Sequence, residues 1–408
     1  MPSSVSDMRQ FILHMDEKTT YPELATTVTP SLLQGELNPF SAARVAESAF
    51  DFEPELVTLD EDFSILKLYN GPSGIFKDFG VAFFGAVLEE LLKETETDHS
   101  MIVSAARGDN GLSLTGAFKG RKGITSVLIY PSGPVSGLDP KEFITNGGNT
   151  IPIQIRGNFD DCNRLIKELI HDRPFAERHN VTSANTINPC RLLPQAFYFL
   201  FAFVKVKKLI KGRELFFSVP SGNFGNFISG LYAWKFGMPL NGFIAAMNLN
   251  DAFGGFIRGE KFDPRPAKTT CSPAMDISFP ANYERLVSFY DDAPAVMRNM
   301  VFPAAIDDEE TLRTMEWVWK KYNTLIDPHS AVAFAAARKL TESDSRHAHT
   351  IILSTGHPAK EAEIVRRATG QLTKLPQKLF SLKQKFNPIA LIDPHLDALE
   401  SAISLCYK

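Results

Sequence analysis

The sequence lacks the features that mark several large classes of protein. Only four cysteines occur among its 408 residues, and Cys162, Cys190, Cys271 and Cys406 form neither a CxxC pair nor a metal-ligand spacing. This usage argues against a small domain built on disulfides and predicts no metal centre. Widely spaced cysteines are typical of reduced thiols, so we expect a cytoplasmic protein.

Strong charge of one sign and long apolar runs are also missing. The formal net charge is −4 and no basic run occurs, so we expect neither nucleic acid nor a membrane surface as a partner. The longest apolar run, AFYFLFAFV at 196–204, is too short to span a bilayer. The polar opening MPSSVSDMRQ predicts no secretory signal. The partner expected for this globular chain is therefore a small molecule.

The chain does contain short apolar or β-branched segments that alternate with helical patterns. The expected strands are 101–106, 124–130, 151–157, 214–220, 242–248 and 349–355. Continuous apolar strands alternating with helices predict an α/β fold with parallel sheets covered on both faces. Ligands in such folds bind at the carboxyl ends of the strands, where the glycine-rich turns of this sequence lie.

The clearest site signal is VPSGNFGN at 219–226, where an expected strand ends and a helix follows. Backbone amides of such a turn, added to the positive end of the helix dipole, form an anion site. Glycines let the backbone approach the anion closely. The segment matches neither GxGxxG nor GxxxxGK[ST], so the usual nucleotide fingerprints are absent. A plain strand-to-helix turn explains these residues equally well.

Two further turns follow expected strands. AARGDNG at 105–111 contains Arg107, whose charge could meet an anionic group, although a simple turn explains the segment too. LSTGHPAK at 353–360 places the hydroxyls of Ser354 and Thr355 at a strand end. His357 in that segment fits either a structural role before a helix-starting proline or acid–base chemistry.

One lysine lies in apolar surroundings. In NGPSGIFKDFG at 70–80, Lys77 stands between Phe76 and Phe79, just after a glycine-rich turn. In one interpretation the phenylalanines begin a buried helix and the lysine extends into water. In the other, Lys77 is partly desolvated, so that its amine can be neutral and form a Schiff base. These residues alone leave both interpretations open.

An anion-binding turn, a lysine in an apolar setting and a hydroxyl at another strand end together suit pyridoxal 5′-phosphate. The turn would bind the cofactor phosphate, Lys77 would form the Schiff base, and a hydroxyl would meet the pyridine nitrogen. The spacing makes this cofactor a candidate.

Seven segments then carry a family resemblance. They are GPSGIFKDFG, GNFDDCNRLIKELIHD, NVTSANTINPCRLLPQAFYF, VPSGNFGNFISGLYAWKFG, NLND, SPAMDI and STGHPAK. Together they resemble threonine synthase, a family of fold-type II pyridoxal-phosphate enzymes related in architecture to the tryptophan synthase β chain. The resemblance runs in the same order from about residue 65 to 370, and GPxxxFKD and PSGNFG are its most specific parts.

The resemblance implies a role for each matching residue. Lys77 would be the catalytic residue, holding the cofactor as a Schiff base and then moving protons. Thr355 would face the pyridine nitrogen with Ser354 as its neighbour, and Asn185 and Asn188 would line the pocket near the ring. The cofactor phosphate would be held by the loop formed by Ser221, Gly222, Asn223, Phe224, Gly225 and Asn226.

The resemblance also implies a reaction, the conversion of O-phospho-L-homoserine and water to L-threonine and phosphate. Protons leave the α- and β-carbons, phosphate leaves the γ-carbon, and water adds at the β-carbon. A mobile base close to both carbons suits these transfers, and Lys77 is the natural candidate. The residues expected to contact the substrate are Ser73, Arg107, Gly108, Asp109, Asn110 and Gly111.

Departures from the family pattern lie near the substrate. Where the family usually has HGPT, residues 70–73 of this chain are NGPS, and where it has SGDTG, residues 107–111 are RGDNG. Gly255 stands where the family has an arginine, and Pro134 where it has a lysine. The altered charges leave two enzymatic interpretations. One is a divergent threonine synthase in which Arg107 replaces the missing cations; the other is a phospho-lyase that forms a 2-oxo acid and ammonia. A pseudo-enzyme that binds the cofactor without turnover is a third, which the intact core motifs disfavour. We favour the synthase.

The resemblance further implies two lobes with the cofactor in the cleft between them. We expect an N-terminal segment at 1–60, a large cofactor-binding domain formed by 61–100 and 175–408, and a smaller substrate-loop domain at 101–174. Lys77 should lie near the start of a helix over 78–94. The expected assembly is a monomer or a homodimer.

Overall fold

The chain forms two compact units, each built from three segments. The computed structural model describes residues 5–106, 109–132, 148–186, 188–210, 212–343, 347–376 and 390–406. Unit 1 comprises Met1–Val28, Phe52–Asn70 and Leu192–Leu375. Unit 2 comprises Thr29–Asp51, Gly71–Arg191 and Pro376–Lys408.

Unit 1 contains a six-stranded sheet. Its order is β1 (Glu55–Thr58), β2 (Phe63–Lys67), β10 (Ala348–Ser354), β7 (Glu214–Pro220), β8 (Gly242–Met247) and β9 (Val301–Ala305). Only β1 is antiparallel to its neighbour, and the other strands run parallel. The strands that carry the predicted anion-binding turn and the predicted hydroxyls, β7 and β10, are therefore direct neighbours.

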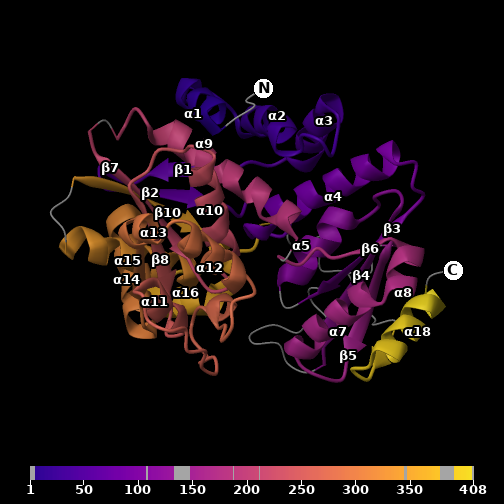
Figure 1. Cartoon of the computed structure of the whole chain (residues 1–408). Coiled ribbons are helices and arrows are strands. Elements are labelled where there is room, and N and C mark those ends of the chain that lie inside the picture. Colours follow the sequence, from indigo (N-terminus) through magenta and orange to yellow (C-terminus); the bar gives the residue numbers. More distant parts are fainter. Residues whose placement is uncertain are drawn as a thin grey trace. The chain divides into compact units, whose positions relative to one another are not determined.

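Helices cover both faces of this sheet (Figure 1). Phe216 in β7 packs edge-on against Phe302, in the same buried cluster as α15, while the next residue, Phe217, packs against Phe199 in α9. Successive strand residues point to opposite faces, so burial on both sides explains the continuous apolar run. The helices are α1 (Val5–His14), α2 (Tyr21–Leu32, which ends in unit 2), α9 (Ala196–Val206), α10 (Gly225–Lys235), α11 (Ala252–Ile257), α12 (Tyr283–Asp292), α13 (Pro294–Met300), α14 (Asp308–Tyr322), α15 (Pro328–Ser343) and α16 (Ala362–Thr369), with the short helices η2 (Leu193–Gln195), η3 (Pro273–Met275) and η4 (Pro358–Glu361).

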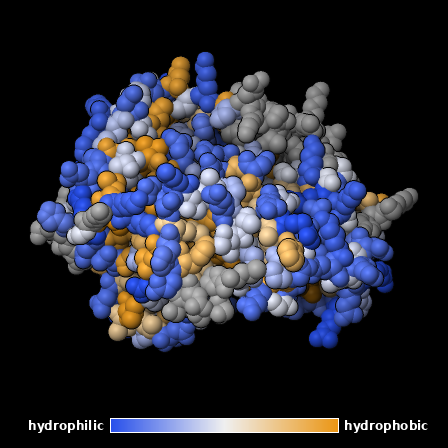
Figure 2. Space-filling view, turned by 90° about the horizontal axis from the view of Figure 1, so that it is seen from above, coloured by the Kyte–Doolittle hydropathy of each residue, from blue (hydrophilic) through white to orange (hydrophobic). Residues whose placement is uncertain are grey.

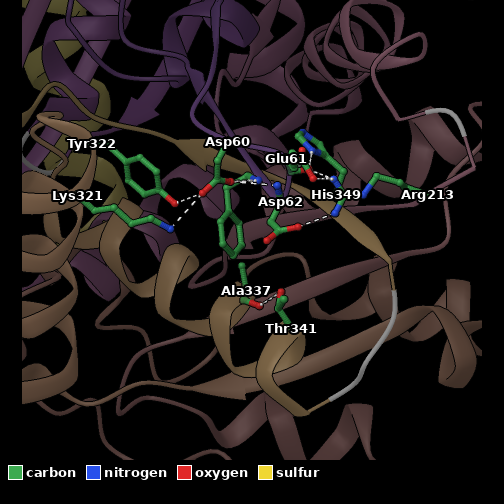
Figure 3. Close-up of polar contacts among 10 residues, drawn as sticks. Asp60, Glu61, Asp62, Arg213, Lys321, Tyr322, Ala337, Thr341 and His349 are labelled. Carbon is green, nitrogen blue, oxygen red and sulfur yellow. Dashed lines mark hydrogen bonds and ion pairs between the residues drawn. The ribbon is translucent and has the colours of Figure 1, made fainter.

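The turn between β1 and β2 is fixed by polar contacts (Figure 3). Asp60 accepts hydrogen bonds from the backbone N–H groups of Asp62 and Phe63 at 3.0 and 2.9 Å and from the side chains of Tyr322 and Lys321. In the next strand, the buried ring of His349 contacts the Glu61 carbonyl at 2.8 Å and the Ser64 hydroxyl at 2.9 Å. These contacts tie β2 to β10 at the amino end of both strands.

Unit 2 contains a five-stranded, fully parallel sheet. Its order is β11 (Ala390–Ile392), β5 (Thr150–Ile155), β4 (Ile124–Pro131), β3 (Ser100–Ala105) and β6 (Val181–Thr182). Helices α7 (Phe159–His171) and α18 (Leu396–Cys406) share one buried cluster with the sheet. Helices α4 (Lys77–Glu94) and α5 (Asp109–Phe118) share another. The remaining elements are α3 (Pro39–Ala49), α8 (Arg173–His179) and η1 (Pro189–Arg191).

Helix α7 shows how local sequence sets an element of unit 2. Asn158 accepts hydrogen bonds from the backbone of Asp160 and Asp161, and the Asp161 carboxylate accepts one from the Asn158 N–H. This capping box satisfies amides that a helix start leaves without partners. Leu165 and Leu169, four residues apart, are fully buried against the sheet, as the predicted helical spacing requires.

The α/β architecture with parallel sheets flanked by helices is confirmed, and the six expected strands are observed within two residues of their predicted bounds. The compact units divide the chain at other positions than the predicted domains. Residues 77–94 form α4, which packs on α3 and α5 and so groups with the strands of unit 2. The predicted division at residues 60, 100 and 174 remains a prediction about functional domains.

Hydrophobic residues are mostly inside the two units. The face shown in Figure 2 is largely hydrophilic, with hydrophobic residues in separate patches. Within the described parts of the chain, no helix combines the length and the hydrophobicity of a membrane span.

Candidate functional site

The predicted anion-binding turn follows β7 in unit 1. The chain leaves the strand at Pro220, adopts a left-handed conformation at Phe224 (φ 56°) and enters α10 at Gly225. The N-cap residue, Phe224, makes no capping hydrogen bond through its side chain, and the amides of a helix N-terminus are ready donors for an anion. A Cβ added at Gly222 would lie 2.7 Å from the Met275 Cα, so only glycine fits there.

Neighbouring loops hold this turn in place. Asn223 Oδ1 accepts a hydrogen bond from the Ala281 N–H at 2.5 Å, and Asn282 Nδ2 donates to the Asn223 carbonyl at 2.9 Å. Asn226 Oδ1 accepts from the Tyr198 hydroxyl at 2.6 Å. The side-chain amide nitrogen of Asn226 is buried and has no hydrogen-bond partner among the described residues. A buried donor without a partner is available to a bound group.

The predicted hydroxyls lie at the carboxyl end of β10, beside that turn. Because β10 pairs in parallel with β7, both strands end at the same edge of the sheet. Ser354 is buried and its hydroxyl is 2.9 Å from the Ser330 hydroxyl. Thr355 is 8% exposed, and its side chain makes no hydrogen bond to the described residues. Thr355 thus keeps a hydroxyl that an added ring could contact.

His357 performs a structural task. Its Nδ1 accepts a hydrogen bond from the Ala359 N–H at 3.1 Å and so caps η4, and its ring packs edge-on against Tyr69. Burial lowers the pKa of His357, and the positive charge of Lys360 acts in the same direction. The structural interpretation of this histidine therefore fits the observed contacts.

Lys77 belongs to unit 2, where it is the first residue of α4 and is half-buried. The expected place of Lys77, near a helix start, is confirmed. The next residue, Asp78, is 3% exposed and fixes the preceding turn. Its carboxylate accepts from the Ser73 N–H at 2.8 Å, the Ser73 hydroxyl at 2.5 Å and the Ser113 hydroxyl at 2.7 Å. These contacts join the turn before Lys77 to helix α5.

The predicted substrate loop is described in part. Arg107, Gly108 and Pro134 lie outside the described residues. Helix α5 begins at Asp109, directly after the two residues outside the described part of this loop. Asn110 Nδ2 donates to the Ala105 carbonyl at 3.2 Å, which ties the helix start to β3.

Asn185 and Asn188 also lie in unit 2, and their side chains contact other residues of that unit. Asn188 Nδ2 donates to the Ser183 carbonyl at 3.1 Å, and Asn188 Oδ1 accepts from the Cys190 N–H at 3.0 Å. Asn185 Nδ2 is 3.5 Å from Asn163 Oδ1. A role beside the cofactor ring stays a prediction for both residues.

Two of the residues that differ from the family pattern, Asn70 and Gly255, have contacts that explain them locally. Asn70 Nδ2 donates to the Glu53 carbonyl at 3.1 Å, so this side chain supports the chain before the Lys77 turn. Gly255 is buried in α11, where an added Cβ would lie 2.8 Å from a Glu260 carboxylate oxygen.

The sequence interpretation missed buried polar residues close to the predicted site residues. In unit 2 the guanidinium of Arg191 is 1% exposed and donates to the Ala184 carbonyl. Burial lowers the pKa of Arg191 to about 10, and the negative charge of Asp78 acts in the opposite direction. In unit 1 a network of Asp327, His329 and Ser330 adjoins Ser354. The segment IDPHSAV contained these three polar residues, but their partners are distant in sequence.

The predicted site residues thus fall into two groups, each described within its own unit. Unit 1 brings together the turn Ser221–Asn226 and the hydroxyls of Ser354 and Thr355. Unit 2 carries the residues Ser73, Lys77, Asp109, Asn110, Gly111, Asn185 and Asn188.

Comparison with known proteins identifies the family. A family model described as "Pyridoxal-phosphate dependent enzyme" matches residues 59–356, and one described as "Threonine synthase, C-terminal" matches residues 330–403. Threonine synthase of Serratia marcescens is 35% identical over 347 residues, which cover 85% of this chain and 79% of that protein. Threonine synthase of Escherichia coli (strain K12) is 34% identical over 332 residues, 81% of this chain and 76% of that protein.

Solved structures agree. The crystal structure of threonine synthase from Escherichia coli has a TM-score of 0.85 at 30% identity and covers 99% of this chain and 91% of that one. The structure of pyridoxal-phosphate-bound threonine synthase from Brucella melitensis also has a TM-score of 0.85, at 28% identity, with coverages of 98% and 90%. Maize serine racemase, at 16% identity and a TM-score of 0.57, shares the fold alone. The chain belongs to the threonine synthase family of fold-type II, pyridoxal-phosphate-dependent enzymes.

Proposed function

We propose that this chain forms L-threonine and phosphate from O-phospho-L-homoserine and water. The observation that carries the proposal is the shared edge of β7 and β10, where the amides at the start of α10 and the Thr355 hydroxyl follow two adjacent parallel strands. Its similarity to the threonine synthases of Serratia marcescens and Escherichia coli supports the same reaction.

The residues present fit pyridoxal 5′-phosphate. When bound, this cofactor supplies a conjugated ring that takes up negative charge from the substrate carbons beside it. The turn Ser221–Asn226 would hold its phosphate through the amides at the start of α10. Thr355, with no partner among the described residues, would face the pyridine nitrogen. The amine of Lys77, a half-buried residue, would be the attachment point.

Lys77 would also act as the base. Its amine would take the proton from the substrate α-carbon, assist proton removal at the β-carbon, supply a proton to the γ-carbon that phosphate has left, and return one to the α-carbon after water has added at the β-carbon. Such a role requires a fixed position, since small displacements of a catalytic group lower rates strongly. Asp78 provides this, because its three hydrogen bonds hold the turn that leads into Lys77.

The substrate anions would be held in unit 2. Helix α5 begins directly after Arg107 and Gly108, so its N-terminal amides and the Arg107 guanidinium would act on the substrate phosphate together. In the family pattern, cations at two other positions are replaced here by Pro134 and Gly255. Arg107 would therefore compensate for charges lost elsewhere.

Product analysis tests the reaction. The protein loaded with pyridoxal 5′-phosphate is incubated with O-phospho-L-homoserine, and the products are identified by NMR and mass spectrometry. We expect threonine and phosphate in equal amounts. Phosphate with 2-oxobutyrate and no threonine would instead support the phospho-lyase. No turnover by a cofactor-loaded protein would indicate a different substrate.

A spectroscopic test addresses Lys77 itself. The loaded wild-type protein should show a visible absorption band, and borohydride reduction should fix the cofactor on the peptide that contains Lys77. The variant Lys77→Ala should lack both signals and all activity. Lys93→Ala, in the last turn of the same helix and on its exposed side, is the matched control and should keep them. Identical spectra for wild type and Lys77→Ala would contradict the assignment.

We also propose the cytoplasm as the compartment and a monomer or homodimer as the assembly. All four cysteines are free thiols in the structure, and burial raises the pKa of Cys162 to about 12. Cell fractionation and light scattering of the purified protein would test the two proposals.

A further inference from the structure

The carboxylate of Asp327 lies where two chains of hydrogen bonds begin. Asp327 precedes α15 and is 1% exposed. One carboxylate oxygen, Oδ2, accepts from His329 Nδ1 at 2.6 Å, and the other, Oδ1, accepts from the N–H and the hydroxyl of Ser330. The two oxygens therefore serve two different branches.

The first branch leads to the predicted phosphate-binding turn. His329 Nε2 accepts a hydrogen bond from the Ala274 N–H at 3.1 Å, and this acceptor role fixes the neutral ring with its proton on Nδ1. Ala274 and Met275 form the surface against which Gly222 packs, since a Cβ at Gly222 would lie 2.7 Å from the Met275 Cα and 3.4 Å from the Ala274 carbonyl oxygen. His329 thus fixes the segment Ala274–Met275, against which the turn packs.

The second branch leads to the strand end that carries Thr355. A carboxylate only accepts hydrogen bonds, so the Ser330 proton points to Asp327 and Ser330 must accept from Ser354. The direction of the Ser354 hydroxyl is thereby set. Ser330 thus holds the end of β10 directly before Thr355.

We propose that Asp327 is a positioning residue that sets two separate cofactor contacts, the phosphate through His329 and the ring end through Ser330 and Ser354. The inference rests on the proposed function for the identity of the cofactor. In this proposal Asp327, His329 and Ser330 position the groups that hold the cofactor and do not contact the substrate. The branches are separable, because they leave Asp327 from different oxygens.

Two probes distinguish the branches. Pyridoxal 5′-phosphate uses both contacts, whereas pyridoxal, which lacks the phosphate, uses only the ring end. His329→Ala should weaken binding of the phosphorylated probe about tenfold and change pyridoxal binding by less than about twofold. Ser330→Ala should weaken binding of both probes by the same factor. Asp327→Asn keeps the shape but only one acceptor oxygen, and should weaken the phosphorylated probe about tenfold or more.

The experiment is a titration of the cofactor-free full chain with each probe, followed by absorbance. Asp60→Asn is the matched control: Asp60 has a similar set of hydrogen bonds but lies at the opposite end of the sheet, before β2, and this variant should bind both probes as wild type does. Circular dichroism verifies folding. If Asp327→Asn does not fold, the His329 and Ser330 variants decide the question.

The outcomes separate the two proposals. Wild-type affinities in all three variants, or equal losses for both probes in His329→Ala, would overturn the positioning role. Because threonine formation is not a readout, a wild-type protein that binds the cofactor and forms no threonine contradicts the proposed function alone. A wild-type protein that binds neither probe contradicts both.

The imidazole of His329 gives a second readout that a merely structural role would not produce. In the wild type, ¹⁵N NMR of labelled histidine should show the proton on Nδ1. In Asp327→Asn that preference should weaken, because the carboxylate that holds the proton is gone. An unchanged tautomer in a variant with weakened cofactor binding would argue against the His329 branch.

Discussion

Each unit buries one aspartate beside a predicted site residue, and the two carboxylates are built alike. Asp78 in unit 2 is 3% exposed and Asp327 in unit 1 is 1% exposed. Each accepts the hydroxyl and the backbone N–H of one serine nearby in sequence, Ser73 or Ser330. In both units the carboxylate thus fixes a turn at the start of a helix.

The difference lies in the remaining partner. The charge of Asp78 acts on the buried guanidinium of Arg191, whereas Asp327 bonds to an imidazole held neutral by Ala274. A carboxylate whose charge acts on a buried cation stabilises the fold, since an uncompensated buried charge is costly. A carboxylate next to a neutral donor mainly selects a tautomer. The comparison teaches that the same residue type can serve stability in one unit and orientation in the other.

The largest expected effect is that of Asp78→Asn. Removing the carboxylate leaves the buried Arg191 guanidinium without its opposing charge, so the free energy of unfolding should fall by about 3–5 kcal/mol. Urea unfolding of the cofactor-free protein measures this change. Glu90→Gln in the same helix is the control: its partners Arg44 and Lys93 are exposed, and about 1 kcal/mol or less should be lost. Equal losses in the two variants would break the comparison.

Asp327→Asn should destabilise the cofactor-free protein less. Its partners are uncharged, so the expected loss is about 1–3 kcal/mol, the usual cost of leaving a buried hydrogen-bonding group without a partner. The same urea series decides the order of the two variants. A loss larger than that of Asp78→Asn would show that charge compensation is not what separates the two aspartates.

The buried His349 of unit 1 adds a test through pH. Burial lowers the pKa of His349, and the positive charge of Arg213 acts in the same direction. The unfolded chain therefore binds a proton at His349 more readily than the folded one. Stability should be lost as the pH falls below 6.5, the ordinary value, by at most about 1.4 kcal/mol per pH unit.

The variant His349→Gln isolates this contribution. It removes the titrating ring, so the free energy of unfolding should fall less steeply between pH 7 and pH 5 than in the wild type. Denaturant unfolding at several pH values gives the two slopes. Parallel slopes would show that His349 takes up no extra proton on unfolding.

Ser113→Ala should have the smallest effect. It removes one of the three hydrogen bonds on Asp78 and leaves the charge in place, so about 1 kcal/mol should be lost. Because Ser113 lies in α5, the same variant tests whether this bond positions the substrate loop. We expect a higher KM for O-phospho-L-homoserine with an unchanged absorption band; a weaker band with unchanged KM would place the effect at Lys77 instead.

The sequence allowed most of the central strands and the helix that begins at Lys77 to be predicted, although the short strand β2 (Phe63–Lys67) was missed. ELFFSVP at 214–220 has the bounds of β7 because both of its faces are buried, so the apolar pattern is complete. β1 was not predicted, since its residues are partly exposed and polar residues surround it. β9 contains Pro303, which only an edge strand tolerates, and β11 has three residues. Such strands are identified by their neighbours rather than by their own residues.

The same limit applies to the site. The predicted anion-binding turn and Lys77 were visible as local motifs, whereas the Asp327 network was not. Asp327, His329 and Ser330 are adjacent in sequence, but their partners Ala274 and Ser354 are reached only once the strands have assembled in the order observed. The pattern of residues within one segment predicts helices, strands and turns. It does not predict hydrogen bonds between loops that are distant in sequence.

The strand order has a consequence for how the protein is made. β10 lies between β2 and β7 in the finished sheet, yet residues 348–354 leave the ribosome long after both neighbours. In unit 2, β11 and α18 come from residues 390–406, which are translated long after β5, the strand beside β11. A nascent chain therefore exposes two incomplete sheets until these residues have emerged, a state prone to aggregation. Chaperones that shield open strand edges during translation should raise the yield of this protein.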